Sequence, residues 1–423
     1  MKIPEKAYAG RKTLAYKEET PYMLKRVKIQ GYKSLVDIDV TLQPLTVLVG
    51  PNAAGKSNFL DALQLLSRIA TSRTLQDAFK PPYRGYPLES FTFGPEGMKR
   101  VMEQTSASFS LEVDVELSSN TIEFANKYVQ QGVQDTTRKR LSEKYIHYRI
   151  DIEITPKSGK LRVLNEEVGE FTETGEQKYG VGQKGDHSLF SRAFPHVPDP
   201  QIIALQQELE DWAFFYFEPR ERMRESHPVR AVNQPGLRGE DVGVFLNTLK
   251  ATNETQFRAI EKALAMMIPS ITGIDIAVND HTGEVELSIM EDNTPISARV
   301  VSEGTLRVLG LLAVGSMQPS PKLIGFEEPE NGVHPRRIRQ IAEFLNTRAM
   351  LGNTQWIVTT HSPILPDKLP ERSLYVCRRD RNQTRIEPIS KWALSEPVYD
   401  IESGLDEDEL TVSERILRGD FDA

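Results

Sequence analysis

Residues 50–57 read Gly50-Pro51-Asn52-Ala53-Ala54-Gly55-Lys56-Ser57 and fill every fixed position of the phosphate-binding loop pattern G-x-x-x-x-G-K-[ST]. The apolar run Leu45–Val49 before them predicts a buried strand, and the run from Ser57-Asn58 to Leu66 predicts an amphipathic helix. In such a loop, backbone N–H groups and the helix N-terminus surround phosphate oxygens, the lysine reaches the outer phosphates and the serine hydroxyl binds Mg²⁺. The stretch therefore predicts a nucleoside triphosphate site formed by residues 50–58. The alternative is a glycine-containing turn with a solvated lysine.

Length and composition limit the classes of protein that this chain can represent. Its 423 residues allow a large core, and a formal net charge of −8 argues against a uniformly basic nucleic-acid surface. The single cysteine, Cys377, excludes an internal disulfide framework and a cysteine-based zinc site, which favours a reducing, cytoplasmic location. We expect no signal peptide and no membrane span, because no uncharged apolar stretch is long enough.

The pattern along the chain predicts five regions. Residues 1–22 form a loosely ordered leader, and residues 23–118 form an N-terminal lobe with the phosphate loop and a β subdomain. Residues 119–210 form an insertion, in which 156–200 lack a clear period and predict a mobile loop. Residues 211–390 form the C-terminal ATPase lobe, followed by an acidic tail at 391–423.

Period-two alternation in residues 109–117 and 148–154 predicts antiparallel strands with one solvent-exposed face. Helical patterns are expected in residues 121–144 and 201–212 and twice within 245–268, and a hairpin is expected at 274–289.

A second group of polar residues follows a short apolar strand at Leu323–Phe326. Glu327 and Glu328 stand at the carboxyl end of this strand, the edge where open α/β sheets bind ligands. Because adjacent side chains at a strand end point in different directions, we expect Glu327 to hold Mg²⁺ and Glu328 to activate the attacking water. A charged, solvated turn is the alternative.

Two further motifs belong to the same prediction. His361 follows the apolar strand 355–358 and is expected to hydrogen-bond the γ-phosphate, although a lone histidine is by default a structural residue. Ser302 and Gly304 precede the apolar helix 308–314 and predict an anion-binding helix tip, with a simple helix cap as the alternative.

The order of these motifs resembles that of the ABC-type ATPases of the RecF and SMC branch, and more narrowly the compact prokaryotic AAA family ATPases (AAA_21-like), several of which serve in antiphage defence. The resemblance covers about residues 23–66 and 210–375. It implies an α/β, ABC-type P-loop ATPase head with a mixed sheet, an antiparallel β lobe and a helical or loop insertion. It also implies that Ser302 and Gly304 touch the γ-phosphate bound to the other subunit, so that two ATP molecules lie at a homodimer interface.

This sequence departs from the pattern of the family at several positions. Glu303 and Thr305 differ from the Leu-Ser-Gly-Gly-Gln form of transporters, and Glu327 replaces the usual aspartate at the magnesium position. The glutamine of the Q-loop stays open, with Gln104 as one candidate.

The function implied is an ATP-gated dimeric switch that hydrolyses ATP to ADP and phosphate. Related overcoming-lysogenisation-defect proteins carry a nuclease domain after the ATPase, whereas 62 residues follow His361 here, so we expect a separately encoded effector. The acidic tail is expected to be solvated, with docking to a basic partner as the alternative.

Two alternatives complete the interpretation. The first is a RecF-like ATPase in DNA repair or maintenance, which would contact nucleic acid through a group of basic residues, unless these form ordinary surface ion pairs. The group comprises Arg220, Arg222, Arg224, Arg230, Arg238 and Arg138-Lys139-Arg140. The second, a transporter subunit, is disfavoured because Ser57 and Ser302 lie 245 positions apart, further than in transport ATPases.

Overall fold

A mixed six-stranded sheet carries the phosphate loop near its middle. In the computed structural model the strand order is β16-β15-β3-β14-β13-β8, and all neighbours are parallel except the edge pair β15–β16. The strands are β3 (Leu45–Val49), β8 (Trp212–Phe215), β13 (Leu323–Glu327), β14 (Gln355–Thr360), β15 (Leu374–Asp380) and β16 (Gln383–Pro388). The structure describes residues 23–94, 96–132, 140–142, 144–172, 175–181, 185–191, 199–391 and 411–419, so the expected leader lies outside the described residues.

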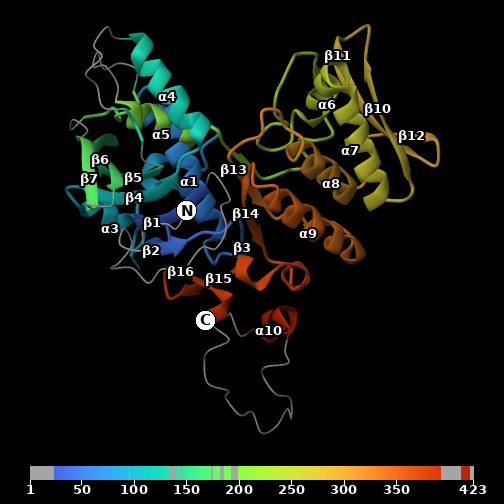
Figure 1. The fold of residues 1–423 in the computed structure, drawn as a ribbon. Helices are drawn as coiled ribbons and strands as arrows, with labels where there is room; N and C mark the ends of the chain where they lie inside the picture. The colour runs from blue at the N-terminus through green and yellow to red at the C-terminus, as the bar shows by residue number, and fades with distance from the viewer. Residues whose placement is uncertain are drawn as a thin grey trace, which may run out of the picture.

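Both faces of this sheet are buried, which is why its central strands are continuous apolar runs. Alternate residues enter two separate cores: Leu48 and Ile357 belong to one, and Val47 and Val358 to the other. Helices α1 (Lys56–Thr71) and α5 (Pro200–Glu210) lie on the first face, and α8 (Glu303–Val314) and α9 (Pro335–Met350) on the second (Figure 1).

An antiparallel sheet of order β2-β1-β4-β5-β6-β7 packs on the side of α1. Its strands are β1 (Met23–Tyr32), β2 (Leu35–Thr41), β4 (Ala107–Glu116), β5 (Tyr145–Thr155), β6 (Lys160–Thr172) and β7 (Gly175–Val181). The prediction of a loop or mobile insertion over 156–200 was therefore wrong for residues 160–172 and 175–181, which form strands, and one sheet crosses the expected boundary at 118/119. The pairing of β5 with β6 shifts register between Asp151 and Ile152. This shift interrupts the two-residue period of β6, which would otherwise have identified it as a strand.

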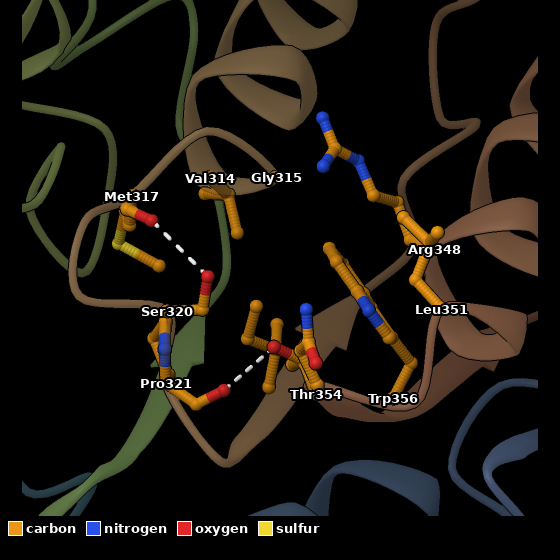
Figure 2. Close-up of a pocket in the computed structure, with 11 residues that line it drawn as sticks. Val314, Gly315, Met317, Ser320, Pro321, Arg348, Leu351, Thr354 and Trp356 are labelled. Atoms are coloured by element: carbon orange, nitrogen blue, oxygen red, sulfur yellow. Dashed lines mark hydrogen bonds between the residues drawn. The ribbon is translucent and has the colours of Figure 1, made fainter.

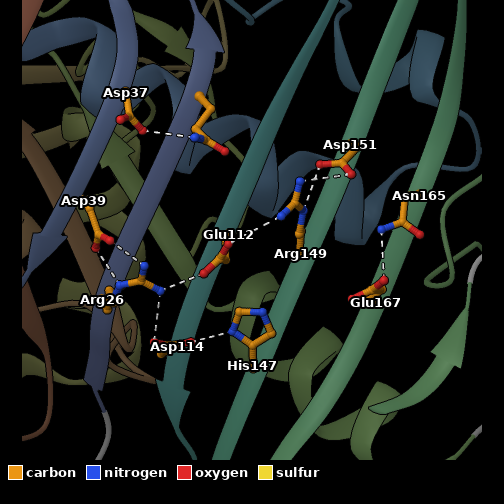
Figure 3. Close-up of polar contacts among 11 residues, drawn as sticks. Arg26, Asp37, Asp39, Glu112, Asp114, His147, Arg149, Asp151, Asn165 and Glu167 are labelled. Carbon is orange, nitrogen blue, oxygen red and sulfur yellow. Dashed lines mark hydrogen bonds and ion pairs between the residues drawn. The ribbon is translucent and has the colours of Figure 1, made fainter. Parts of the chain in front are cut away.

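The expectation of one solvent-exposed face on these strands was also wrong. Arg26 is almost fully buried between β2 and β4, where its guanidinium lies 2.5 Å from Asp39 and 2.7 Å from Glu112 (Figure 3). Asp114 is buried beside it and lies 2.6 Å from Nδ1 of His147. Cross-strand ion pairs thus bury residues that alternate like a solvated face.

The C-terminal lobe confirms the expected helices and hairpin. Helices α6 (Val242–Thr252) and α7 (Glu254–Met267) pack against α8 and a small sheet. Its strands are β9 (His227–Pro228), β10 (Ile271–Val278), β11 (Glu284–Glu291) and β12 (Thr294–Ser297).

The remaining helices are short, apart from α4. They are α2 (Leu75–Ala78), α3 (Met98–Glu103), α4 (Ser119–Gly132), α10 (Val412–Arg418) and the 3₁₀ turns Pro87–Ser90, Pro366–Lys368, Glu371–Ser373 and Ile389–Lys391. Among the described residues, no helix combines the length and apolar character needed to cross a membrane.

Part of the acidic tail is not simply solvated, contrary to the expectation. Val412 and Ile416 of α10 pack against the second core, and Ser413 hydrogen-bonds Asp367 and the carbonyl oxygen of Pro363. The other tail residues, 392–410 and 420–423, lie outside the described residues.

Candidate functional site

The phosphate loop connects β3 to α1 and is closely packed. A Cβ on Gly50 would lie 1.9 Å from the carbonyl oxygen of Cys377, and one on Gly55 would lie 2.0 Å from Oγ1 of Thr384. Gly55 also has φ +104°, a conformation that favours glycine. Neither position has space for a Cβ, and the backbone conformation at Gly55 also favours glycine.

Lys56 lies inside this loop, 6% exposed. Its ammonium donates hydrogen bonds to the carbonyl oxygens of Gly50 (2.7 Å) and Pro51 (2.8 Å). Burial lowers the pKa of Lys56, and nearby carboxylates, Glu328 among them, oppose that shift. A charge held among carbonyl oxygens in a partly desolvated loop is suited to bind phosphate.

The edge strands β15 and β16 hold the other side of the loop, a contribution that the sequence did not indicate. The Thr384 hydroxyl donates to Ala54 O (2.8 Å), and Arg379 donates to Ala53 O (3.2 Å). Asn58, expected to contact nucleotide, donates instead to Ser34 Oγ (2.8 Å), which in turn bonds Thr384. Asn52 and Ala53 are the exposed residues of the loop.

The two predicted Mg²⁺ ligands lie together. The hydroxyl of Ser57, in the first turn of α1, donates to Oε2 of Glu327 at 2.9 Å, although 270 residues separate them. Burial raises the pKa of Glu327, and Arg84 and Ser57 act against that shift. A hydroxyl beside one carboxylate is part of the donor set of Mg²⁺ in P-loop ATPases, so the chemistry of these two residues fits the ion.

Arg84 is a site residue that the sequence reasoning missed. Its Nη2 donates to Oε1 of Glu327 at 2.7 Å, and its guanidinium stacks over Tyr216 with 4.9 Å to the ring centroid. Asp61 lies 3.8 Å from Arg84 and 2.7 Å from Lys33. No motif surrounds Arg84, so its proximity to the magnesium position was not visible in sequence.

Glu328 and His361 form a second pair, as the prediction of a shared site requires. Nδ1 of His361 lies 2.9 Å from Oε1 of Glu328, and both side chains are partly exposed. Glu328 has φ +47°, a strained conformation for a non-glycine residue that is concentrated at functional sites. Its N–H donates to Thr359 O at 3.0 Å, which fixes it beside the end of β14.

The third acid of this stretch has a different role. Glu330 is 4% exposed and accepts a hydrogen bond from the hydroxyl of Thr360, the residue before His361. Burial raises its pKa. Glu330 therefore anchors the end of the strand that precedes His361.

The expected anion-binding tip, residues 302–305, caps α8. The Ser302 hydroxyl accepts a hydrogen bond from the Thr305 N–H at 3.2 Å. A Cβ on Gly304 would lie only 2.4 Å from Gly332 O, so the tip packs against the loop that follows Glu328. Arg307, one turn further along α8, donates to the carbonyl oxygen of Glu328 at 3.4 Å. The tip therefore touches the turn that carries Glu328, yet α8 and α1 lie on opposite faces of the sheet (Figure 1).

The arginines considered for nucleic-acid binding make contacts within the chain. Arg220 pairs with Glu303 (2.6 Å) and Arg230 with Asp241 (2.5 Å). Arg224 donates to Val301 O (2.9 Å). Arg222 and Arg238 lie further from their common partner Glu218, at 3.9 Å and 3.8 Å. These contacts support the interpretation as surface ion pairs. Arg138 and Lys139 lie outside the described residues, and Gln104 is an exposed residue at the end of α3.

The fold and this geometry define a class, the nucleotide-binding ATPases of the SMC, RecF and OLD type. The chain belongs to the family whose model is described as "AAA domain, putative AbiEii toxin, Type IV TA system", which matches residues 45–367. A crystal structure of the SmcHead bound to the C-winged helix domain of ScpA is similar in fold, with a TM-score of 0.54, 12% identity and coverage of 87% of this chain and 99% of that chain.

Relatives by sequence agree. The chain is 22% identical to the OLD nuclease of Thermus scotoductus over 397 residues, which is 85% of this chain and 63% of the relative. A RecF protein of Gloeobacter violaceus is 42% identical over 55 residues, 13% of this chain and 15% of that protein. The chain therefore spans less than two thirds of the OLD nuclease that it resembles.

Proposed function

We propose that this chain is an ATP-gated switch that works as a homodimer and controls a separately encoded effector in a prokaryotic antiphage defence system. The observation that carries the dimer is the placement of Ser302 and Gly304. They lie on α8, across the sheet from the α1 face that carries Lys56, so each phosphate loop needs a helix tip from another copy.

Within that site, each residue has a defined task. Lys56 and the backbone of residues 50–57 bind the phosphates, and Ser57 and Glu327 would hold Mg²⁺, which would neutralise phosphate charge when bound. Glu328 orients and deprotonates the attacking water, and its pairing with His361 keeps the carboxylate in place. Gly304 brings the backbone N–H groups of the α8 tip close enough for the partner's nucleotide.

A mixing experiment tests the composite site. Lys56→Ala and Ser302→Arg should each abolish turnover, the first in the phosphate loop and the second in the helix tip. In an equimolar mixture, half of the dimers combine the two chains, and one site in each such dimer is intact. About a quarter of the wild-type turnover should therefore return. An inactive mixture of well-folded chains that still exchange subunits would contradict the composite site.

Glu328→Gln tests the assignment of the base. This chain should bind ATP and stay dimeric in light scattering, because closure is retained while hydrolysis stops. Glu343→Gln, an exposed change on α9, is the matched control and should hydrolyse normally. Undiminished turnover by Glu328→Gln would remove the assignment.

The defence role rests on relatives. The family description names a putative toxin of a toxin–antitoxin system, and the OLD nuclease covers 85% of this chain. The DNA-repair alternative has less support, because the arginines proposed to contact phosphates are engaged within the chain. Co-purification with the products of adjacent genes, followed by phage challenge of cells that lack the chain, tests the role.

A further inference from the structure

A second site lies at the opposite end of the sheet from the nucleotide. A pocket of about 40 Å³ opens where β13 and β14 begin, whereas Glu327 and His361 stand where these strands end. Its lining includes Val314, Ser320, Arg348, Thr354 and Trp356 (Figure 2). No acidic side chain is among the residues that line it.

Two hydrogen-bond donors of this pocket lack an acceptor among the described residues. Trp356 is 1% exposed, and its indole Nε1–H is buried with no hydrogen-bond partner. Arg348 has no carboxylate within ion-pair distance in the described part of the chain, and burial alone lowers the pKa of its guanidinium. The guanidinium carbon of Arg348 lies 5.4 Å from the ring centroid of Phe344, which offers no oxygen. The indole N–H of Trp356 is a buried donor without an acceptor, which is costly, whereas the Arg348 guanidinium beside it is partly exposed; a bound acceptor would satisfy the indole and meet the arginine charge.

The small volume of the pocket suits a small hydrogen-bond acceptor. A water needs about 10–15 Å³ of such space, so about three atoms of that size fit into 40 Å³. A carboxylate has three heavy atoms, and an arginine beside an N–H donor is a favourable partner for it.

An apolar groove of about 360 Å³ continues from the pocket and shares Arg348 and Leu351 with it. It runs between α7 and α9 over the end of α8, which lies between them in Figure 1. Its walls are Ala259, Ile260, Ala263, Leu312 and Phe344. Its one carboxylate, Glu343, is paired with Arg339 at 2.9 Å.

The rim of the groove is also apolar. Met266 and Met350 are each 67% exposed and Leu351 is 60% exposed. Met266 extends the stripe of Ala259 and Ala263 along α7. Exposed methionines and leucine beside an open groove are typical of a surface that binds another protein.

We propose that this pocket and groove bind an acidic–apolar segment of a partner protein, with an Asp or Glu carboxylate on Arg348 and Trp356 and the adjoining apolar side chain on Phe344 and Ala263. The groove is at the far end of α8 from Ser302, about 18 Å along a helix of 12 residues. The partner therefore does not cover the nucleotide site, and the inference does not depend on ATP hydrolysis.

Calorimetry with small probes tests the chemistry on the full chain without nucleotide. Octanoate carries both the carboxylate and the apolar part, so it should bind more tightly than octanamide, which has no charge, and acetate, which has no chain. Arg348→Gln and Trp356→Phe should each weaken octanoate binding about ten-fold, the effect of losing one charge-assisted hydrogen bond. Arg258→Gln removes a charge from the exposed face of α7 and should have no effect. Equal binding of octanoate and octanamide, or equal loss in Arg258→Gln, would overturn the site.

A displayed library of twelve-residue peptides separates a protein partner from a small molecule. Peptides selected on the wild-type chain and depleted on Arg348→Gln should carry Asp or Glu next to Leu, Phe or Met. Octanoate binding without such peptides would overturn the protein partner in favour of a small carboxylate. The acidic residues 406–409 of the chain itself provide a further control, with each changed to its amide. If this change tightens octanoate binding about ten-fold or more, this segment itself binds in the groove, and the proposal of a partner protein fails. Thermal melting of each variant confirms that it is folded.

Discussion

Replacing Gly304 by alanine should separate nucleotide binding from turnover. The added Cβ would lie 2.4 Å from Gly332 O, whereas Cβ atoms do not approach heavy atoms closer than 3.0 Å, so the α8 tip or the 328–333 loop must shift by about 0.6 Å. The neighbour is backbone and cannot rotate away. The shift acts on the turn that carries Glu328, because Gly332 and Glu328 belong to one hydrogen-bonded loop.

The expected magnitude follows from this displacement. A misplacement of catalytic groups by about 1 Å costs about a hundred-fold in rate, so a shift of roughly half that size should lower kcat by about ten-fold to a hundred-fold. Overpacking should lower the free energy of unfolding by about 1–3 kcal/mol. ATP affinity of the monomeric chain should be unchanged, because the atoms nearest to the added Cβ belong to Gly332 and Val333 and not to residues 50–57.

The assay measures kcat by phosphate release and ATP affinity by calorimetry on Gly304→Ala. Gly243→Ala is the matched control, since its Cβ would meet nothing closer than 3.7 Å on helix α6. That control should retain full kcat and gain up to about 1 kcal/mol of stability. Wild-type kcat in a folded Gly304→Ala chain, or equal loss in both variants, would refute the argument that the tip packs tightly against the catalytic turn.

Three further predictions concern the phosphate loop, the magnesium position and the tail. Lys56→Ala should abolish ATP binding in calorimetry, and retained affinity would show that Lys56 is not the phosphate ligand. The pKa of Glu327 is raised, so Mg²⁺-supported ATP binding should be lost, as pH falls, at a higher pH than for an ordinary glutamate. Arg84→Gln should move the pH at which ATP binding is lost still higher, because Arg84 lowers the pKa of Glu327. If the midpoint of this pH profile stays in place or moves down, the pairing of Arg84 with Glu327 is contradicted. Ser413→Asp should release α10 by repulsion from Asp367, seen as faster proteolysis at 411–419 than in Ser413→Ala, and equal rates would reject the docking contact.

The residues that local motifs singled out lie close together in the structure, and their roles in binding and hydrolysis stay predictions. A strand, a glycine loop and a helix predict the phosphate site without knowledge of the rest of the chain, because the loop forms between adjacent elements. Parallel strands end at a common edge, so Glu327, Glu328 and His361 were expected to lie there, and Ser57 was expected to share Mg²⁺ with Glu327. The direct contact between Glu328 and His361 was not predicted.

The features that were missed depend on contacts between distant residues. Arg84 reaches Glu327 from a loop without periodicity, and Thr384 reaches Ala54 from an edge strand far along the chain. The buried charges of the antiparallel lobe were misinterpreted for the same reason. Period two indicates a strand but does not say whether its polar face meets water or, as around Arg26, the charges of neighbouring strands.

Glu327, which we propose as the magnesium ligand, illustrates how geometry can replace the aspartate usual at this position. Glu327 is the last residue of β13, and its Oε2 reaches the Ser57 hydroxyl at 2.9 Å while its Oε1 meets Arg84 at 2.7 Å. An aspartate at the same Cα would be shorter by one methylene, about 1.5 Å, and would reach one of these partners at most. The longer side chain therefore suits a site in which an arginine shares the carboxylate. Arg84 and Glu327 are best understood as a coupled pair, which explains how the chain departs from the aspartate pattern and still brings a carboxylate to the serine of its phosphate loop.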